Sequence, residues 1–507
     1  MISRSLKLGT RRSLLAWAQS SWVARQIEAV NPGLSIELVG IETRGDRIQD
    51  IPLSQVTGKE FFVAEIDQVL TTGDVDLTVH SMKDLSLERP HPLQLAAIPR
   101  RENPRDVILF GPDVLGKLAR GATLKIGTSA PRRIENIPAF LEQALPRLAF
   151  GVPKVELVEI RGNVNTRASR LHEPPTAPKH LDGVVLAFAG LIRLWKDEKG
   201  RAELSQLLQG VRWMVLPLRE CPTAPAQGAL AIECRAKDSE ALALIRKIHC
   251  TETARHVGIE RELLREWGGG CHQRFGATSV AHEKLGDLFF IRGRLSDDKS
   301  VEELRWTAPA ASPAALRAWD GSALRDAVFK TQPLARAESG VTGAVFAAHS
   351  RAAEGVRFEK SARIWTSGTK SWFKLALQGL WVEGCAENLG FEGVKSTLTE
   401  PVLGLPNAEQ WDILTHCNAI DGWSWGRVIP TYRVQPDFGK GEVDSLKQAT
   451  HVFWSSGSQF EALRGQVSGK ARHACGPGKT SEVLMASGVS AVDVFPSVEE
   501  WKKWVKI

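Results

Sequence analysis

The sequence predicts an α/β fold that is divided into several domains. Strand-like and helix-like segments alternate along the first part of the chain, and turns of glycine, serine and arginine follow the strands. Such alternation is typical of parallel strands joined by crossover helices. The chain has 507 residues, which is too long for one hydrophobic core, so we expect three or four domains.

The composition is that of an ordinary globular protein. Hydrophobic residues make up 43% of the chain and charged residues 24%, which decides against fibrous and disordered classes. No apolar run approaches the roughly 18 residues of a membrane span, and the N-terminal residues lack the apolar segment of a signal peptide. The seven cysteines form no C-x-x-C pair, which indicates reduced thiols. We therefore expect a cytoplasmic protein without a membrane partner.

The net charge of +7 allows two classes of partner, nucleic acids and small molecules with many carboxylates. A nucleic-acid surface would show a dense run or stripe of lysine and arginine. Here the arginines stand singly or in pairs beside turns. This pattern favours a small polycarboxylate and argues against nucleic acid.

The first α/β region has three predicted strands with two helices between them. The strands are expected at residues 6–10, 36–41 and 75–79, and the helices at 14–30 and 61–70. The polar residues that follow the first and third strands include Arg11, Ser13, Lys83 and Asp84. Because ligands of open α/β sheets bind at the carboxyl ends of the strands, we expect a binding site there. The alternative is that strand-end loops are polar in any case.

The second α/β region repeats this arrangement. Strands are expected at 124–127, 155–160 and 183–189, each followed by small residues and then arginine. Small residues let backbone N–H groups approach an anion, and arginine offers a planar donor fork that matches a carboxylate. The residues in question are Ser129, Arg132, Arg133, Arg161, Arg167 and Arg193.

A glycine-rich segment delivers one cysteine, Cys271, after a helix expected at 251–267. Three glycines, 268–270, precede it, and their backbone freedom and lack of side chains would let the thiol stand in open space. The alternative is a loop with an incidental buried thiol. Strands expected at 276–280 and 288–294 complete a small α+β domain.

Eight motifs of the first 340 residues resemble the porphobilinogen deaminase family, also called hydroxymethylbilane synthases. They are GTRRS at Gly9, TRGD at Thr43, HSMKD at His80, GTSAPRR at Gly127, RGNVNTR at Arg161, AGLIRL at Ala189, QGALAIECR at Gln227 and GGGC at Gly268. The resemblance implies two lobes like those of periplasmic binding proteins, 1–103 with about 212–236 and 104–211. It also implies a cofactor-cysteine domain at 237–340.

The resemblance further implies that four porphobilinogen molecules are condensed to hydroxymethylbilane with release of ammonia, in tetrapyrrole biosynthesis. It implies a dipyrromethane cofactor attached covalently through Cys271, no metal, and Asp84 as the catalytic carboxylate. By residue pattern alone, Asp84 could equally be a helix N-cap. The implied cofactor contacts are Lys83, Ser129, Arg132, Arg133 and Arg161, and the implied substrate contacts are Arg11, Ser13, Lys59, Arg167 and Arg193.

Some residues depart from the family pattern. Leu14 stands where proline is usual, Gln55 stands where lysine is usual, and 272–276 replace the usual Q-V-P-I-G. These departures concern cofactor handling and chain-length control, and none of them removes a residue needed for the chemistry.

The C-terminal part, 361–507, resembles the uroporphyrinogen-III synthase family, which acts next on hydroxymethylbilane. The motifs are TSGTKSW at Thr366, PTYR at Pro430, FWSSGSQF at Phe453 and ACGPGKT at Ala474. We expect an α/β domain in which the opening strand and helix of one lobe are missing, preceded by a helix at 316–329. The resemblance suggests Tyr432 as the group that aids departure of the terminal hydroxyl, although a structural phenol is an equal alternative. Candidate carboxylate binders are Ser456, Ser458 and Thr480.

Three readings of function therefore stand side by side. The first is a monomeric transferase that builds hydroxymethylbilane, with a C-terminal domain that either cyclises the product or has no catalytic role. The second is a two-lobed polycarboxylate-binding module without catalysis. The third is a basic protein that binds nucleic acid.

Overall fold

The computed structural model describes residues 4–43, 63–149, 151–268, 273–310, 317–321, 329–334, 340–436 and 443–506. These residues form two compact units. The first contains most of the chain up to residue 304, and the second contains 305–507 together with the short segments 143–146 and 281–288. Within the described residues, no helix is both long and apolar enough to span a membrane.

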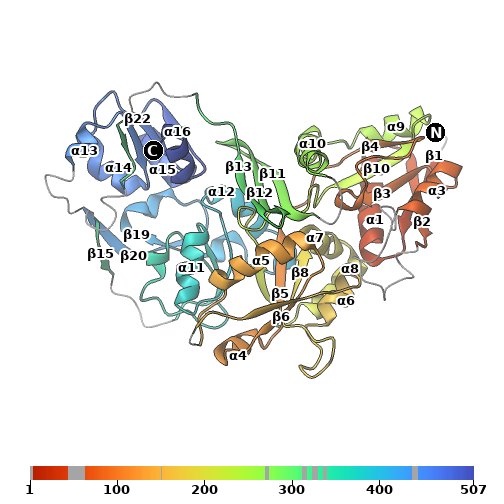
Figure 1. Cartoon of the computed structure of the whole chain (residues 1–507), viewed down its shortest axis with the longest axis horizontal. Helices are drawn as coiled ribbons and strands as arrows, with labels where there is room; N and C mark the ends of the chain where they lie inside the picture. The colour runs from red at the N-terminus through yellow and green to blue at the C-terminus, as the bar shows by residue number, and fades with distance from the viewer. Residues whose placement is uncertain are drawn as a thin grey trace. The chain divides into compact units, whose positions relative to one another are not determined.

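The first sheet of unit 1 has the strand order β2-β1-β3-β10-β4 (Figure 1). Its strands are β1 (Arg4–Arg11), β2 (Leu34–Ile41), β3 (Leu77–Ser81), β4 (Leu93–Ala97) and β10 (Leu230–Arg235). β1 pairs in parallel with β2 and β3, whereas β10 is antiparallel to both of its neighbours. The helices α1 (Leu14–Val30) and α3 (Ala64–Thr72) connect the parallel strands. The predicted alternation of strand and helix is confirmed in this region.

Helix α1 begins where the sequence predicts. Ser13 is its N-cap, and the Ser13 hydroxyl accepts a hydrogen bond from the Ala16 N–H at 3.3 Å. Leu14 is therefore the first helical residue, a position where proline is favoured but not required. This departure from the family pattern leaves the helix intact.

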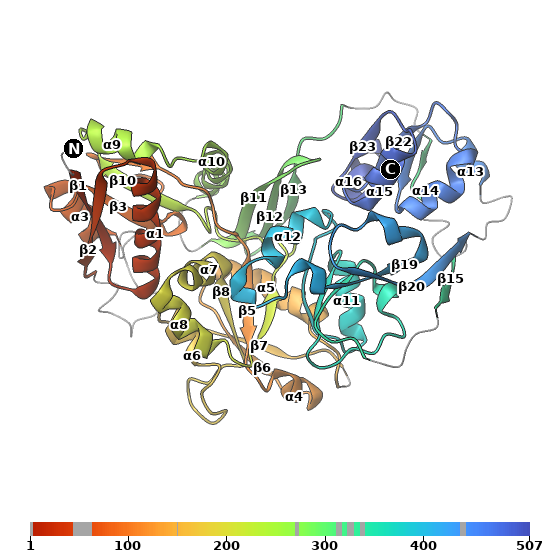
Figure 2. The same ribbon diagram turned by 180° about the vertical axis from the view of Figure 1, so that it is seen from behind.

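The second sheet of unit 1 has the order β7-β6-β8-β5-β9. Its strands are β5 (Asp106–Phe110), β6 (Leu124–Gly127), β7 (Val155–Val158), β8 (Gly183–Ala187) and β9 (Arg212–Val215). β6 is parallel to β7 and β8, and β5 is antiparallel to β8 and β9. The helices of this lobe are α4 (Val114–Ala119), α5 (Pro131–Ala144), α6 (Val164–Ser169), α7 (Phe188–Lys196) and α8 (Glu198–Leu207). The two sheets thus share one topology, and Figure 2 shows α6, α7 and α8 beside the second sheet.

A smaller α+β part of the chain follows the second lobe. It contains α9 (Ser239–Arg246), α10 (Thr251–Glu266) and an antiparallel sheet of β11 (Arg274–His282), β12 (Gly286–Ser296) and β13 (Lys299–Arg305). Leu263 of α10 packs with Phe275, Ala277, Phe289 and Ile291 of the sheet. The predicted helix and strands are present here, while Cys271 lies outside the described residues.

Unit 2 contains a six-stranded and a four-stranded sheet. The first has the order β15-β20-β19-β16-β17-β18 and the second β14-β21-β22-β23. The strands are β14 (Ala318–Trp319), β15 (Phe329–Pro333), β16 (Ala344–Ala347), β17 (Arg363–Thr366), β18 (Val382–Cys385), β19 (Asp412–His416), β20 (Arg427–Pro436), β21 (His451–Trp454), β22 (Arg472–Cys475) and β23 (Val492–Val494). Its α-helices are α11 (Thr369–Leu377), α12 (Glu392–Leu398), α13 (Asp444–Lys447), α14 (Gly457–Leu463), α15 (Lys479–Ala486) and α16 (Val498–Val505).

The helix predicted at 316–329 is wrong. Residues 318–319 form β14, which pairs in parallel with His451 and Val452 of β21, and Trp319 packs into the core of that sheet. Pairing with a strand that is distant in sequence overrides the local helix preference. β14 and β16 both precede residue 361, so the C-terminal sheets begin earlier in the chain than the range 361–507.

We expect a Gly276→Ala substitution in β11 to destabilise unit 1. An added Cβ would lie 2.0 Å from the Pro222 carbonyl oxygen, and the hydrogen bond from Ala277 N to Thr223 O, 2.8 Å long, prevents the two segments from separating. We expect a loss of about 2–3 kcal/mol in the free energy of unfolding, measured by urea denaturation.

Gly258→Ala is the matched control, because Gly258 lies in α10 and an added Cβ would meet nothing within 4 Å. It should be neutral or stabilising by up to about 1 kcal/mol. Equal stability of the two variants would contradict the close approach at Gly276.

Candidate active site

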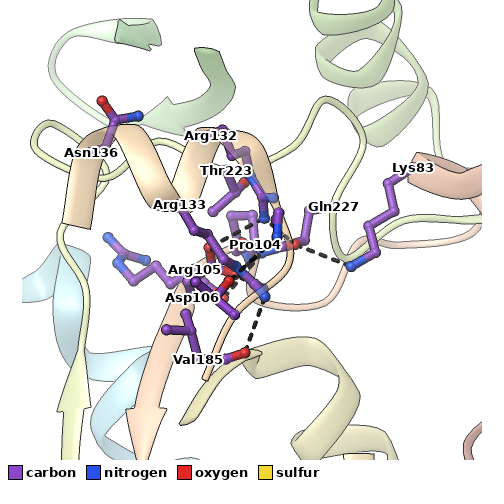
Figure 3. A network of polar contacts seen from close by, with 12 residues as sticks. Lys83, Pro104, Arg105, Asp106, Arg132, Arg133, Asn136, Val185, Thr223 and Gln227 are labelled. Carbon is purple, nitrogen blue, oxygen red and sulfur yellow. Dashed lines mark hydrogen bonds and ion pairs between the residues drawn. The ribbon is translucent and has the colours of Figure 1, made fainter. Parts of the chain in front are cut away.

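A buried amide, that of Gln227, connects the strand ends of the two lobes (Figure 3). Its Oε1 accepts hydrogen bonds from Lys83 Nζ at 3.3 Å and from Arg132 Nη2 at 3.1 Å. Its Nε2 donates to Pro104 O and to Asp106 Oδ1, both at 2.8 Å. Gln227 is fully buried, so this side chain fixes two cations and one carboxylate relative to one another.

Asp106, the first residue of β5, neutralises part of this cluster. Arg133 donates to both carboxylate oxygens, at 2.6 and 2.9 Å, and Arg132 donates at 3.2 Å. Burial alone would raise the pKa of Asp106, but the two guanidinium charges hold it well below its usual range. One ionised carboxylate faces two buried arginines, so the cluster keeps a net positive charge.

Lys83 and Asp84 belong to the single 3₁₀ turn η2 (Met82–Asp84) that follows β3. Burial lowers the pKa of Lys83 to about 8, and the negative charge of Asp84 opposes this shift. Asp84 is exposed. The N-cap alternative for Asp84 is wrong, because η2 ends at Asp84 and the backbone of Leu85 is extended.

A small pocket adjoins Asp84. Arg11, Gln19, His80 and Ser81 line it together with Asp84. Gln19 donates to the Ser81 hydroxyl at 3.3 Å, and burial lowers the pKa of His80 to about 4, which leaves the imidazole neutral at ordinary pH. The pocket therefore combines one carboxylate, one guanidinium and neutral polar groups.

Three further arginines lie in the second lobe. Arg161 follows β7. Arg167 of α6 donates from Nε to Gly162 O at 2.8 Å, and Arg193 of α7 donates to Gly228 O at 2.6 Å. Burial lowers the pKa of Arg167 and of Arg193 to about 10, and the neighbouring charges of Arg133, Arg170 and Arg161 add to the shift at Arg167. Arg167 and Arg193 remain charged at neutral pH, so their buried guanidinium groups favour binding of anions.

Ser129 positions a turn. Its hydroxyl hydrogen-bonds to Ile160 O and accepts from Ile160 N at 3.0 Å. The backbone that leads into Arg161 is held in this way. Ser13 likewise caps α1, as described above. Lys59 and Cys271 lie outside the described residues.

The C-terminal candidates are placed as follows. Ser456 is the N-cap of α14 and accepts from Gln459 N at 3.2 Å, and Ser458 and Thr480 lie in the first turns of α14 and α15. Tyr432 of β20 is 8% exposed, packs in a hydrophobic cluster with its ring 5.8 Å from that of His416, and has its pKa raised by burial. Within the described part of the chain, no hydrogen bond joins these four side chains.

Sequence reasoning missed several members of the site. Gln227 lies in the turn before β10 and Asp106 is the first residue of β5, so neither belongs to the segments that follow the strands. The amide and the carboxylate are 121 residues apart. Gln19 sits on the buried face of α1. The only signal for Gln227 was its position inside the QGALAIECR motif.

Asp67, His80 and Glu233 lie close enough together to hold a metal ion. The Arg89 guanidinium already occupies the space between the two carboxylates, 2.5 Å from Asp67 and 2.8 Å from Glu233. This arginine supplies the positive charge that a metal would bring.

The fold and the site define a two-lobed α/β protein with a buried cationic centre, and the comparisons place it in a family. Residues 6–243 match the family model described as "Porphobilinogen deaminase, dipyromethane cofactor binding domain". The porphobilinogen deaminase of Syntrophotalea carbinolica is 42% identical over 318 residues, which cover 62% of this chain and 91% of the relative. That of Bacillus subtilis is 38% identical over 279 residues, which cover 55% and 79% respectively.

The chain therefore belongs to the porphobilinogen deaminase family. The alignments cover about 60% of it, and they assign no family to the C-terminal unit. Among solved structures, the effector-binding domain of BenM with its effector benzoate aligns with 53% of this chain at 13% identity and a TM-score of 0.25.

We expect Lys83 to titrate near pH 8 in a Cys271→Ser variant, which cannot carry the expected dipyrromethane. Its charge is fully present below this pH and is lost as the pH rises above it, whereas an ordinary lysine keeps its charge to about 10. NMR of ¹³C-methylated lysines measures the value, and Lys83→Arg identifies the resonance. Adding Asp84→Asn should lower the pKa further, because Asp84 favours the charged form; a rise would contradict the arrangement.

Proposed function

We propose that unit 1 condenses four porphobilinogen molecules head to tail to hydroxymethylbilane, with loss of ammonia at each addition. The observation that carries this proposal is the cationic centre around Gln227. Lys83 and Arg132 donate to the Gln227 amide, while Arg132 and Arg133 share the carboxylate of Asp106. The growing chain carries two carboxylates on every pyrrole, and arginine and lysine are the side chains that bind such groups. Family membership supports the same reaction.

The described residues fit a bound dipyrromethane. The buried Arg132 Nε has no hydrogen-bond partner among them, and its guanidinium charge is only partly balanced by Asp106. We propose that Lys83, Ser129, Arg132, Arg133 and Arg161 surround the cofactor, with Ser129 and Arg133 acting through the backbone turn and the ion pair described above. When bound through Cys271, this group supplies the anchored end to which the product chain is attached.

We propose that Asp84 is the catalytic carboxylate. Departure of ammonia from porphobilinogen requires a proton on the amine and leaves a positive charge on the methylene-pyrrole. A carboxyl group beside the pyrrole N–H can hold a proton for the leaving group and stabilise the cation that forms. Asp84 is exposed at the pocket and is close enough to influence the pKa values of Lys83, Arg132 and Arg167, so it can act on a substrate whose carboxylates those side chains bind. Arg11, Ser13, Lys59 and Arg193 complete the proposed substrate contacts.

We further propose that unit 2 cyclises hydroxymethylbilane to uroporphyrinogen III. The specific observation is its topology, because the chain begins in one sheet with β14, passes through the other sheet and returns with β21. Two sheets joined in this way offer two sets of strand ends to one ligand. Tyr432 lies in β20, which pairs with β15. β15 is the first strand of the six-stranded sheet after β14, and β20 is its last strand before β21. The alternative is that unit 2 has no catalytic role and that only the deaminase is active.

A small-molecule substrate and product require neither a macromolecular partner nor a membrane. We propose that the enzyme works as a cytoplasmic monomer without nucleic-acid or membrane partners. The six described cysteines are not in disulfide bonds, and a reducing compartment is where such thiols are usual.

Intact mass and turnover together test the deaminase. We expect wild-type protein to be heavier than its sequence by one dipyrromethane and to consume porphobilinogen. Cys271→Ser should lose both properties, whereas Asp84→Asn should keep the extra mass and lose turnover by about 100-fold or more. An active protein without extra mass would refute the role of Cys271, and a fully active Asp84→Asn variant would refute that of Asp84.

The isomer of the final product tests unit 2. With porphobilinogen as the only substrate, an active synthase should yield uroporphyrinogen III, because spontaneous ring closure gives isomer I. Tyr432→Phe should shift the product towards isomer I without slowing porphobilinogen consumption, if the phenol assists departure of the hydroxyl. Isomer I alone from the wild-type protein would show that unit 2 is not a synthase.

A further inference from the structure

The carboxylate of Asp84 is positioned by its backbone. Among the described residues it makes no hydrogen bond or ion pair, so its location follows from the turn 82–86. That turn has little internal support, since Leu85 N donates to Met82 O at a long 3.3 Å and Met82 N is bound to Ala229 O at 3.0 Å. The far side of the turn is held from outside it, in part by Arg89, whose Nη1 donates to the Ser86 hydroxyl at 3.3 Å, and in part by α10.

Arg261 of α10 fills this role. Its Nη1 donates to Met82 O and to Leu85 O, each at 3.1 Å, and its Nη2 donates to Ser86 O at 2.8 Å. These carbonyls lie on both sides of Asp84 in the chain. A planar guanidinium reaches separated acceptors from different nitrogens, whereas a lysine ammonium offers all its donors from one nitrogen. Burial lowers the pKa of Arg261, and the three carbonyls take up its buried donors.

The helix that carries Arg261 is itself fixed. The preceding residue, Glu260, is fully buried and accepts from Arg101 at 2.7 and 3.0 Å. It also accepts from Ala226 N and Ser279 N, both at 2.6 Å. Because Glu260 anchors α10 to three separate segments, Arg261 projects from a rigid base, which is what a group that places another side chain requires.

We infer that Arg261 is a positioning residue for the carboxylate of Asp84. The same helix, α10, ends at Glu266 and leads into the segment that contains Cys271. Arg261 thus ties the turn that carries Asp84 to α10. This inference rests on the proposed deaminase reaction.

Arg261→Met removes the three hydrogen bonds while keeping most of the side-chain volume. We expect kcat for porphobilinogen consumption to fall by about 10- to 100-fold, because a small displacement of a reacting group has an effect of this size. KM and the dipyrromethane mass should change little, because Lys83 and the arginines proposed to bind cofactor and substrate are unchanged. Arg261→Lys should lie between the variant and the wild type.

The matched control is Arg265→Met. Arg265 lies one turn further along α10, is exposed and pairs only with Glu262 among the described residues. We expect wild-type kcat from this variant, which would show that losing an arginine from α10 is not harmful in itself.

A double-mutant cycle separates positioning from a general effect on stability. In an Asp84→Asn background the carboxylate is already absent, so adding Arg261→Met should cause little further loss of single-turnover rate. The inference would be overturned if the double variant lost rate by the product of the two single-variant factors. It would also be overturned if Arg261→Met carried the dipyrromethane and kept the wild-type kcat. If the methionine variant does not fold, the lysine variant enters the same cycle. An inactive wild-type protein would instead refute the proposed reaction.

Discussion

The pairing of one buried carboxylate, Asp106, with two buried arginines is the interaction on which the site of unit 1 depends. Removing ionised groups from water is costly unless they are paired and hydrogen-bonded. Asp106 meets this condition for Arg133, which it binds through both oxygens, and only in part for Arg132. Gln227 then extends the network to Lys83 in the other lobe. The site is thus rigid and keeps an excess of positive charge that a ligand with carboxylates can neutralise.

The shared topology of the two sheets explains why so many cations meet. In each sheet the parallel strands end at one edge, and the turns that follow carry arginine, lysine or serine. Burial lowers the pKa of Arg167, and repulsion from the guanidinium groups of Arg133, Arg170 and Arg161 lowers it further. A bound anion relieves such repulsion. Several clustered arginines therefore favour binding of a polycarboxylate more strongly than a single arginine would. Asp84, at the same edge as Lys83, adds an exposed carboxylate.

The C-terminal unit follows a different plan. Its core is rich in tryptophan, with Trp365, Trp372, Trp411, Trp454 and Trp501 among its fully buried side chains. Tyr432 is also largely buried and packs near His416. Serine caps at the helix starts are local features of the fold as well as possible contacts for carboxylates. The proposed function of unit 2 therefore rests more on its sheet topology than on a cluster of functional side chains.

The sequence by itself determined the elements whose signals are local. Residues 14–30 form a helix within the predicted bounds because an apolar period of 3.6 and the Ser13 cap are both readable along the chain. The strand-end arginines could be predicted for the same reason. Only the tertiary structure decided that 318–319 is a strand, and only it revealed Gln227 and Arg261. The partners of these residues are far away in sequence, 121 residues for Gln227 with Asp106 and 179 for Arg261 with Met82. Contacts over such distances arise from the packing of whole elements, and no local pattern records them.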